Sequence, residues 1–276
     1  MKRAFRQVDV FTAVPYYGNP LAVVVDGEGL SQEEMQRFAR WTNLSETTFL
    51  LPPADPEADY LVRIFTPAQE LPFAGHPTLG SCQVWLEAGG RPKTEGVVVQ
   101  ECGAGLVRIR REGASLAFAA PPLIRSGELP PELLDEVARA LGLGQEDIVA
   151  AAWADNGPGW VAVELADAEA VLALRPGYLE QKIGVVGAWP PGSETDYEVR
   201  AFFPVDGVMR EDPVTGSLNA SVAQWLLGRG RAATPYTASQ GTVMGRAGRV
   251  RVSTDEQGTI WVGGEVVTCV NGEVNL

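Results

Sequence analysis

The chain has 276 residues, a length that suits two domains of ordinary size better than one large domain. Hydrophobic residues make up 45% and charged residues 21%, which is typical of a folded soluble protein and unlike a disordered or fibrous chain. The net charge of -13 repels phosphate backbones, so we expect no nucleic-acid partner.

The sequence shows neither the pattern of a membrane span nor that of a signal peptide. The longest apolar run, Ile148 to Ala154, has seven residues, whereas a membrane span needs roughly 18 or more. The opening segment MKRAFRQVDVF alternates like a strand and lacks the apolar region of a signal peptide. We therefore expect a cytoplasmic protein that binds no membrane.

Metal and cofactor chemistry is constrained by a few residues. Cys82, Cys102 and Cys269 are widely spaced without a CxxC motif, and we interpret them as small buried hydrophobes. His76 is the single histidine, which excludes a multi-histidine zinc site. Gly103-Ala104-Gly105 lacks the third glycine of a dinucleotide fingerprint, and a strand rather than a helix follows it. We expect neither a metal nor a cofactor.

In chain order, the first predicted helix begins at a capping box formed by Ser31 and Glu34 and runs through Trp41. A second helix is predicted over Pro131–Leu141, closed by Gly142, with one apolar face that packs on a sheet. We expect it to be the second-half counterpart of the first helix. The segments 71–86 and 213–228 carry no charge, so each predicts a helix buried on all sides.

An internal repeat relates the two halves of the chain. The segment DYLVRIFTP (59–67) aligns without gaps to DYEVRAFFP (196–204), with six identities in nine positions. After four extra residues, 70–86 aligns with 211–227. The alignment sets His76 against Ser217, Asp212 against Leu71, and Glu46 against Ile183. We interpret the chain as a tandem duplication, and the duplicated Arg63 and Arg200 as internal ion-pair partners.

The fold class that follows is α+β, with two lobes of similar build. We place the N-terminal lobe at 1–125 and the C-terminal lobe at 126–276, because proline and glycine gather between 121 and 131. A last pair of strands is expected at 250–254 and 259–268, and these strands could pack back on the first lobe. Each lobe should wrap its strands around its uncharged helix.

The starts of the two uncharged helices are candidate binding sites. Pro77 makes His76 the expected N-cap of the first, with Thr78 and Leu79 as free donors, and Ser217 follows Gly216 at the aligned place. Free N–H groups and the helix dipole attract a carboxylate or phosphate. We expect the two starts to line one cleft, so that neither lobe holds a complete site.

Chemistry-bearing residues break this symmetry. Glu46 lies in a segment that leads toward the core, and a carboxyl partly removed from water there is suited to accept and return a proton. Each residue also has a purely structural interpretation: Glu46 as a surface charge at a strand end, His76 as a helix cap, and Asp212 as a turn residue before Pro213.

Several motifs together resemble the phenazine-biosynthesis PhzF-like family, over nearly the whole chain. They are VDVFT with GNPLAV, NLSET, FAGHPTLG and EDPVTGS, at residues 8–12, 18–23, 43–47, 73–80 and 211–217. The resemblance implies the diaminopimelate epimerase-like fold, with two pseudo-symmetric lobes, each with strands around a central helix. It further implies a cofactor-independent isomerase related to the dihydro-hydroxyanthranilate isomerases.

The resemblance assigns roles to particular residues. It implies that Glu46 moves a proton between substrate carbons, while His76, Asp212 and Ser217 line the pocket. Related racemases use a pair of cysteines at the helix starts, where this chain has His76 and Ser217, so two-thiol racemisation is not expected. With backbone donors near Gly75 and Gly216, the predicted function is isomerisation of a small carboxylate-bearing metabolite. A non-catalytic protein that binds small anions on the same fold is the alternative, and a homodimer is the candidate assembly.

Overall fold

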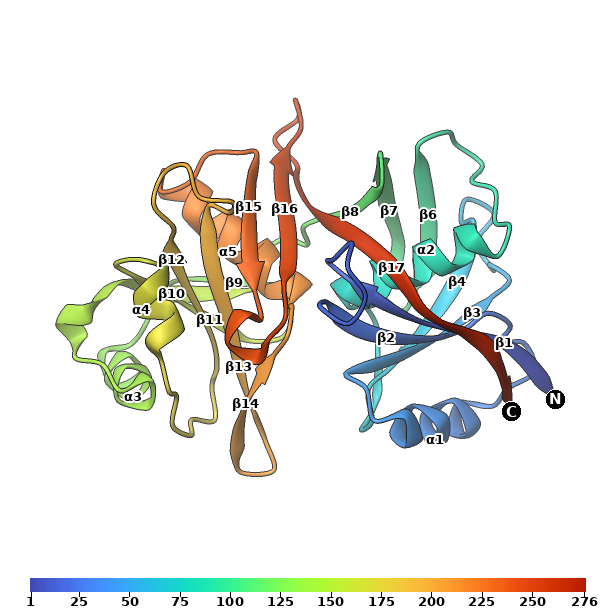
Figure 1. Cartoon of the computed structure of the whole chain (residues 1–276), viewed down its shortest axis with the longest axis horizontal. Coiled ribbons are helices and arrows are strands. Elements are labelled where there is room, and N and C mark those ends of the chain that lie inside the picture. Colours follow the sequence, from blue (N-terminus) through green and yellow to red (C-terminus); the bar gives the residue numbers. More distant parts are fainter. The chain divides into compact units, whose positions relative to one another are not determined.

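The computed structural model describes all 276 residues and divides into two compact units (Figure 1). Unit 1 comprises Met1–Ala119 and Gly263–Leu276, and unit 2 comprises Ala120–Val262. Unit 1 thus ends ahead of residue 125, where the sequence analysis divides the chain, and regains the last residues of the chain. No helix is both long enough and apolar enough to span a bilayer.

Unit 1 contains two helices and most of its strands in one continuous run of the chain. Its elements are β1 (Lys2–Val10), β2 (Asn19–Val24), α1 (Gln32–Thr42), β3 (Glu46–Leu51), β4 (Tyr60–Phe65), β5 (Glu70–Leu71), α2 (Gly75–Glu87), β6 (Val97–Cys102), β7 (Gly105–Glu112) and β8 (Ser115–Ala119), joined by most of β17 (Ile260–Asn275). The strands pair in the order β17-β1-β2-β3-β4-β6-β7-β8, with β5 added beside β4. The two ends of the chain meet where β1 pairs with β17 (Figure 1).

Unit 2 is built from the middle of the chain. Its elements are β9 (Arg125–Glu128), α3 (Pro131–Leu141), η1 (Gln145–Asp147), β10 (Ile148–Asp155), β11 (Trp160–Leu165), α4 (Ala168–Ala173), β12 (Lys182–Ala188), β13 (Tyr197–Val205), β14 (Val208–Asp212), α5 (Gly216–Gly228), β15 (Tyr236–Gln240), η2 (Thr242–Met244) and β16 (Gly248–Thr254). The strands pair in the order β9-β10-β11-β12-β13-β15-β16, with β14 beside β13.

The pairing directions repeat from one unit to the other, as the tandem duplication predicts. In unit 1, β2/β3 and β4/β6 are parallel, while β3/β4, β4/β5 and β6/β7 are antiparallel. In unit 2, β11/β12 and β13/β15 are parallel, while β12/β13, β13/β14 and β15/β16 are antiparallel. The shared plan fixes which residues of the two units are equivalent.

The register corrects one assignment made from the sequence. Thr47 pairs with Phe65 in unit 1, and Ile183 pairs with Phe202 at the same place in unit 2. Ile183 is therefore the equivalent of Thr47, and the equivalent of Glu46 is Lys182, one residue earlier. The register of a strand is set by its pairing partners. The aligned identities near these strands do not fix the register, so the alignment from sequence was shifted by one residue.

The predicted surface helices form, but their equivalence differs from the expectation. The Ser31–Glu34 capping box opens α1, and Gly142 closes α3 in the left-handed conformation with φ 73°. The helix that connects β11 to β12, as α1 connects β2 to β3, is α4 rather than α3. Helix α4 is not predicted from the sequence, because its six residues show too little periodicity to be recognised.

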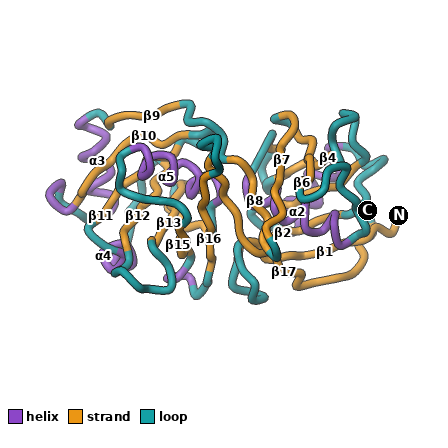
Figure 2. The backbone as a smooth tube through the Cα atoms, turned by 90° about the horizontal axis from the view of Figure 1, so that it is seen from above, coloured by secondary structure: helices purple, strands orange, loops and turns teal.

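The two uncharged helices pack against the strands of their own units (Figure 2). Every residue from Gly75 to Cys82 of α2 is buried, and α2 contacts β1, β2, β3 and β8. Helix α5 is similarly buried over most of its length and contacts β10, β11, β12 and β16. The other face of each sheet is covered by an apolar cluster that includes Phe49 in unit 1 and Ile183 in unit 2.

Candidate active site

The centre of unit 1 brings Glu46 and His76 into contact. Glu46 is the first residue of β3, and His76 is the second residue of α2. Glu46 Oε2 lies 3.4 Å from His76 Nδ1, and the two side chains are 16% and 6% exposed. A carboxyl and an imidazole, predicted separately as site residues, therefore form one cluster.

Strand alternation explains why Glu46 faces the helix. Thr48, two residues further along β3, lies on the same face, and its hydroxyl accepts a hydrogen bond of 2.9 Å from Ser81 in α2. Phe49 points to the opposite face and packs in the cluster under α1. The pattern of β3 thus directs Glu46 toward the first turn of α2.

Asn19 also belongs to this cluster, although it was not among the predicted site residues. It is fully buried, and its Nδ2 lies 3.5 Å from His76 Nδ1. The sequence shows Asn19 only as part of the turn Gly18-Asn19-Pro20. The parallel pairing of β2 with β3 places the first residues of both strands beside the helix. A prediction of this pairing would have identified Asn19.

His76 is neutral near physiological pH. Burial lowers the pKa of its imidazole to about 3, opposed in part by a hydrogen bond with the Pro20 carbonyl. The nearby Glu46 carboxyl does not change this outcome, because removing the imidazolium from water costs more than one long contact of 3.4 Å returns. His76 Nε2 is also buried and has no hydrogen-bond partner.

The start of α2 differs from the expectation that His76 is its N-cap. The N-cap is Ala74, and the Thr78 N–H, expected to be free, donates to the Ala74 carbonyl at 3.1 Å. The N–H groups of the first helical turn have no partner within the helix, so the N–H that Pro77 lacks is not needed there. The helix can therefore begin two residues before Pro77. The N–H groups of Gly75 and His76 lie in this first turn, which no side chain caps.

The start of α5 follows the same plan. Its N-cap is Thr215, not Ser217, and the Asn219 N–H donates to the Thr215 carbonyl at 3.0 Å. Ser217 is the second residue of the helix, as His76 is in α2. Its hydroxyl accepts a 3.1 Å hydrogen bond from the indole N–H of Trp160.

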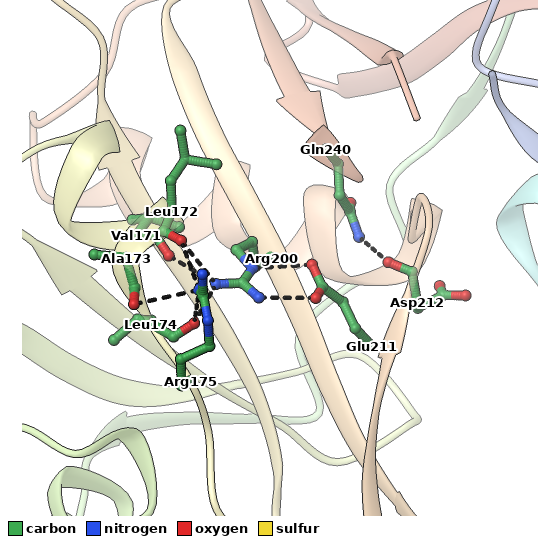
Figure 3. A network of polar contacts seen from close by, with 9 residues as sticks. All are labelled: Val171, Leu172, Ala173, Leu174, Arg175, Arg200, Glu211, Asp212 and Gln240. Atoms are coloured by element: carbon green, nitrogen blue, oxygen red, sulfur yellow. Dashed lines mark hydrogen bonds and ion pairs between the residues drawn. The ribbon is translucent and has the colours of Figure 1, made fainter. Parts of the chain in front are cut away.

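Asp212 is held beside this second helix start. Its carboxylate accepts a hydrogen bond from the Thr215 hydroxyl, and its carbonyl accepts one of 3.2 Å from Gln240 Nε2 (Figure 3). Gln240 Oε1 accepts from the Thr215 N–H at 3.0 Å and from Asn219 Nδ2 at 2.8 Å. The buried Gln240 amide therefore links the end of β14 to the first turn of α5.

The duplicated arginines are ion-pair partners, as the sequence predicts. Arg63 binds Glu70 through two hydrogen bonds of 2.7 and 2.6 Å, and Arg200 binds Glu211 through two of 2.9 and 2.8 Å (Figure 3). Arg200 also donates to the carbonyls of Val171 in α4 and Leu174 at its C-terminal end, each at 3.0 Å. Each ion pair joins the short strand that precedes the buried helix of its unit, β5 or β14, to the neighbouring strand.

Two of the three cysteines are buried, as expected from the sequence, and the third is not. Cys82 and Cys102 are buried, and burial raises the pKa of the Cys82 thiol to about 12. Cys269 is half-buried, and burial raises the pKa of its thiol too. A thiol with a raised pKa is a poor nucleophile or proton carrier near neutral pH.

The predicted site residues therefore fall into two groups. Glu46, His76 and Gly75 lie at the start of α2 in unit 1. Asp212, Gly216 and Ser217 lie at the start of α5 in unit 2. Each group combines uncapped backbone N–H groups with a carboxyl side chain.

The class of the protein follows from its fold and from its family. The fold is that of PhzF and diaminopimelate epimerase-like proteins. A crystal structure of the Bacillus anthracis phenazine biosynthesis protein of the PhzF family superposes with a TM-score of 0.84 at 23% identity, covering 100% of both chains. The chain belongs to the phenazine biosynthesis-like protein family, whose PhzC-PhzF model matches residues 8–272.

Relatives of known name support the same class. The chain is 36% identical to antisense-enhancing sequence 1 of Schizosaccharomyces pombe, over 99% of this chain and 98% of that protein. It is 33% identical to the trans-2,3-dihydro-3-hydroxyanthranilate isomerase of Pseudomonas fluorescens, over 87% of this chain and 86% of that protein. Several relatives are named isomerases, and the protein is an isomerase.

Proposed function

We propose that this isomerase moves a proton between carbon atoms of a small carboxylate-bearing metabolite, with Glu46 as the acid/base. The Pseudomonas fluorescens relative is named for trans-2,3-dihydro-3-hydroxyanthranilate, which makes that compound the first substrate to test. The reaction needs no metal or cofactor in this proposal, because a proton leaves one carbon for the carboxylate and returns to another.

The observation that carries the proposal is the contact of Glu46 with His76. A general base must be able to meet the proton that it removes, and its environment must tolerate both of its charge states. The Glu46 side chain is largely buried but 16% exposed, so it is shielded from bulk water and still accessible. No cysteine with a suitable pKa competes with it for the role.

His76 fits the role of a neutral hydrogen-bonding partner. Because burial lowers its pKa to about 3, it does not carry the proton itself at neutral pH. A neutral imidazole can donate from Nδ1 to the Glu46 carboxylate, or accept at Nδ1 from the protonated carboxyl in the other tautomer. Its unpaired Nε2 is free to bind an amino, hydroxyl or ring group of the substrate.

The remaining groups in this proposal are Gly75 of unit 1 and three residues of unit 2. Asp212 would polarise the substrate, and the backbone N–H groups of Gly75, Gly216 and Ser217 would hold its carboxylate. Each unit would wrap its strands around α2 or α5. The protein would act in the cytoplasm as a homodimer, without nucleic-acid or membrane partners.

Incubation with trans-2,3-dihydro-3-hydroxyanthranilate in D2O tests the proposal. A proton carried by Glu46 exchanges with solvent, so the product should contain deuterium on one carbon, visible by NMR and mass spectrometry. A parallel incubation with a pool of small unsaturated carboxylates identifies another substrate of the same class by the same label.

Two results would count against the proposal. Tight binding of these carboxylates without any labelled product would favour the alternative of a non-catalytic protein that binds small anions. Labelling that persists in Glu46→Gln would show that another group carries the proton.

A further inference from the structure

The position of unit 2 that is equivalent to Glu46 holds a lysine. We propose that Lys182 binds the carboxylate of the substrate and so selects carboxylate-bearing ligands, an inference that rests on the proposed function above. Lys182 would be a specificity-determining residue that supplies charge and does not transfer a proton.

Strand register gives the first reason. Leu21 of β2 pairs with Glu46 of β3, and Trp160 of β11 pairs with Lys182 of β12, in equivalent parallel pairs. Each charged residue is the first of its strand. The duplicated scaffold thus presents a carboxylate at this place in one unit and an ammonium in the other.

The face of β12 that carries Lys182 is the face toward α5. Gly184, two residues further along and on the same face, lies so close to the helix that a Cβ there would be 2.1 Å from Leu218 Cδ1. Leu218 is the third residue of α5. Ile183 points to the opposite face, into the cluster packed under α3 and α4.

The neighbour of Lys182 reaches the start of α5. Trp160, its partner in register, donates its indole N–H to the Ser217 hydroxyl at 3.1 Å. Parallel partners project their side chains to the same face of a sheet. Lys182 therefore lies beside the residue that contacts Ser217, as Glu46 lies beside His76 in unit 1.

Lys182 has no ion-pair partner within the protein. The side chain is half-buried, and no carboxylate lies within ion-pair distance. Burial lowers the pKa of its ammonium, and the only opposing charge is the more distant Asp155. One Asp155 oxygen already accepts from the N–H groups of Gly157 and Gly159, at 2.7 and 2.6 Å.

A half-buried ammonium without an ion-pair partner costs free energy, which a bound anion would recover. In a chain with a net charge of -13, a local cation also offsets the repulsion of an anionic ligand. The competing explanation is that the Lys182 stem only covers apolar surface while its head stays in water. Replacing Lys182 with methionine separates the two explanations, because methionine keeps the apolar stem and removes the charge.

Two aromatic compounds form a matched pair of probes. 3-Hydroxyanthranilate carries the amino, hydroxyl and carboxylate groups of the candidate substrate, and 2-aminophenol lacks only the carboxylate. Dissociation constants for both are measured by calorimetry with the wild-type protein, Lys182→Met and Lys182→Arg. Lys2→Met serves as the control, because Lys2 is an exposed lysine paired with Glu273.

We expect Lys182→Met to weaken binding of 3-hydroxyanthranilate about 10- to 100-fold, the loss expected for a hydrogen bond to a charged group. Binding of 2-aminophenol should change less than about twofold, since methionine keeps the apolar stem. Lys182→Arg should recover part of the affinity, and Lys2→Met should match the wild type. In turnover, Lys182→Met should raise KM and leave kcat nearly unchanged.

Equal losses for both probes, or no loss for either, would overturn the inference, as would a wild-type protein without preference for the carboxylate probe. These outcomes are distinguishable from a failure of the proposed function. If the wild type isomerises its substrate but Lys182→Met binds the carboxylate normally, only the inference fails. If binding depends on Lys182 but no proton is transferred, only the proposed function fails.

Discussion

The starts of α2 and α5 share a backbone plan but carry different chemistry. Each helix follows a short strand, and its second residue contacts a neighbouring side chain. In unit 1 that second residue is His76, in contact with the Glu46 carboxyl. In unit 2 it is Ser217, which accepts from Trp160, with Lys182 at the position of Glu46. Side chains that differ between equivalent positions are therefore the candidates for function.

The groups that remain the same in both units support the scaffold. The ion pairs Arg63–Glu70 and Arg200–Glu211 join equivalent strands by equivalent double hydrogen bonds. Both arginines also lie over a phenylalanine of their own strand, Phe65 at 5.1 Å and Phe202 at 4.8 Å. The asymmetric positions should therefore govern activity, and the symmetric positions should govern stability.

The largest effect is expected at Glu46. Glu46→Gln keeps the shape of the side chain but removes the transferable proton, so turnover should fall about 10²- to 10⁴-fold while folding and ligand binding are retained. Glu33→Gln, at an exposed position of α1, is the matched control and should turn over like the wild type. Initial rates and thermal unfolding of both variants provide the measurement. Glu46→Gln activity within a few-fold of wild type would remove Glu46 from the mechanism.

The duplicated ion pairs should differ in their effect on stability. Arg200→Met leaves the Glu211 carboxylate, 14% exposed, and two carbonyls without their donor, and should cost about 3–5 kcal/mol in the free energy of unfolding. Arg63→Met removes a pair whose side chains are 25% and 30% exposed, and should cost about 1 kcal/mol or less. Urea unfolding measures both. Equal costs would mean that burial does not set the difference between the units.

Much of the fold was predictable because the duplication leaves identities where strands and ion pairs repeat. The segments 59–67 and 196–204 contain the paired arginines and strand residues that packing requires in both units. Two features were not predictable. Helix α4 has six residues and little periodicity, and the position equivalent to Glu46 depends on a pairing register that the sequence around Ile183 does not specify.

The candidate site was predictable residue by residue but not in its contacts. Glu46 and His76 stand out as a carboxyl near an apolar run and the single histidine, yet their 3.4 Å contact depends on the packing of β3 against α2. Asn19 and Gln240 escaped notice because amides are common in turns and strands. Only tertiary structure shows that both are fully buried against helix starts.

Because the imidazole of His76 is buried, the stability of the protein should depend on pH. Ser217, the equivalent residue of unit 2, has no group that titrates in this range and should add no such dependence. The folded-state pKa of His76 is about 3, below the unfolded value of about 6.5. Between these two pH values the unfolded chain binds one proton more than the folded protein. The free energy of unfolding is therefore highest above about pH 6.5 and decreases as the pH falls. Relative to His76→Gln, the wild type should lose about 1.4 kcal/mol per pH unit between pH 6 and pH 4. The opposite slope would show an imidazolium paired with Glu46.

Substitution of two buried glutamines should show that an effect on stability can occur with or without an effect on activity. Gln240→Leu removes the acceptor of the Thr215 N–H and the donor to the Asp212 carbonyl. Gln100→Leu removes a 2.9 Å hydrogen bond from Tyr60 and a 3.0 Å hydrogen bond to Thr78 in α2. Each should cost about 1–3 kcal/mol in the free energy of unfolding. Only Gln240→Leu should also raise KM, because it releases Asp212; equal kinetic effects would contradict this role for Asp212.

The smallest effect is expected at Ser217, the counterpart of His76. The proposed function uses its backbone N–H, which alanine retains, so Ser217→Ala removes only the hydroxyl that accepts from Trp160 at 3.1 Å. The loss should be about 1 kcal/mol in stability and less than tenfold in kcat/KM, since the uncapped first turn of α5 is unchanged. Ser217→Pro is the informative contrast: proline is tolerated in a first helical turn but deletes the N–H, so it should reduce affinity for 3-hydroxyanthranilate while the helix persists. A Ser217→Ala defect as large as that of Glu46→Gln would mean that the hydroxyl itself takes part in the reaction, and that the second helix start is chemically active rather than a binding site.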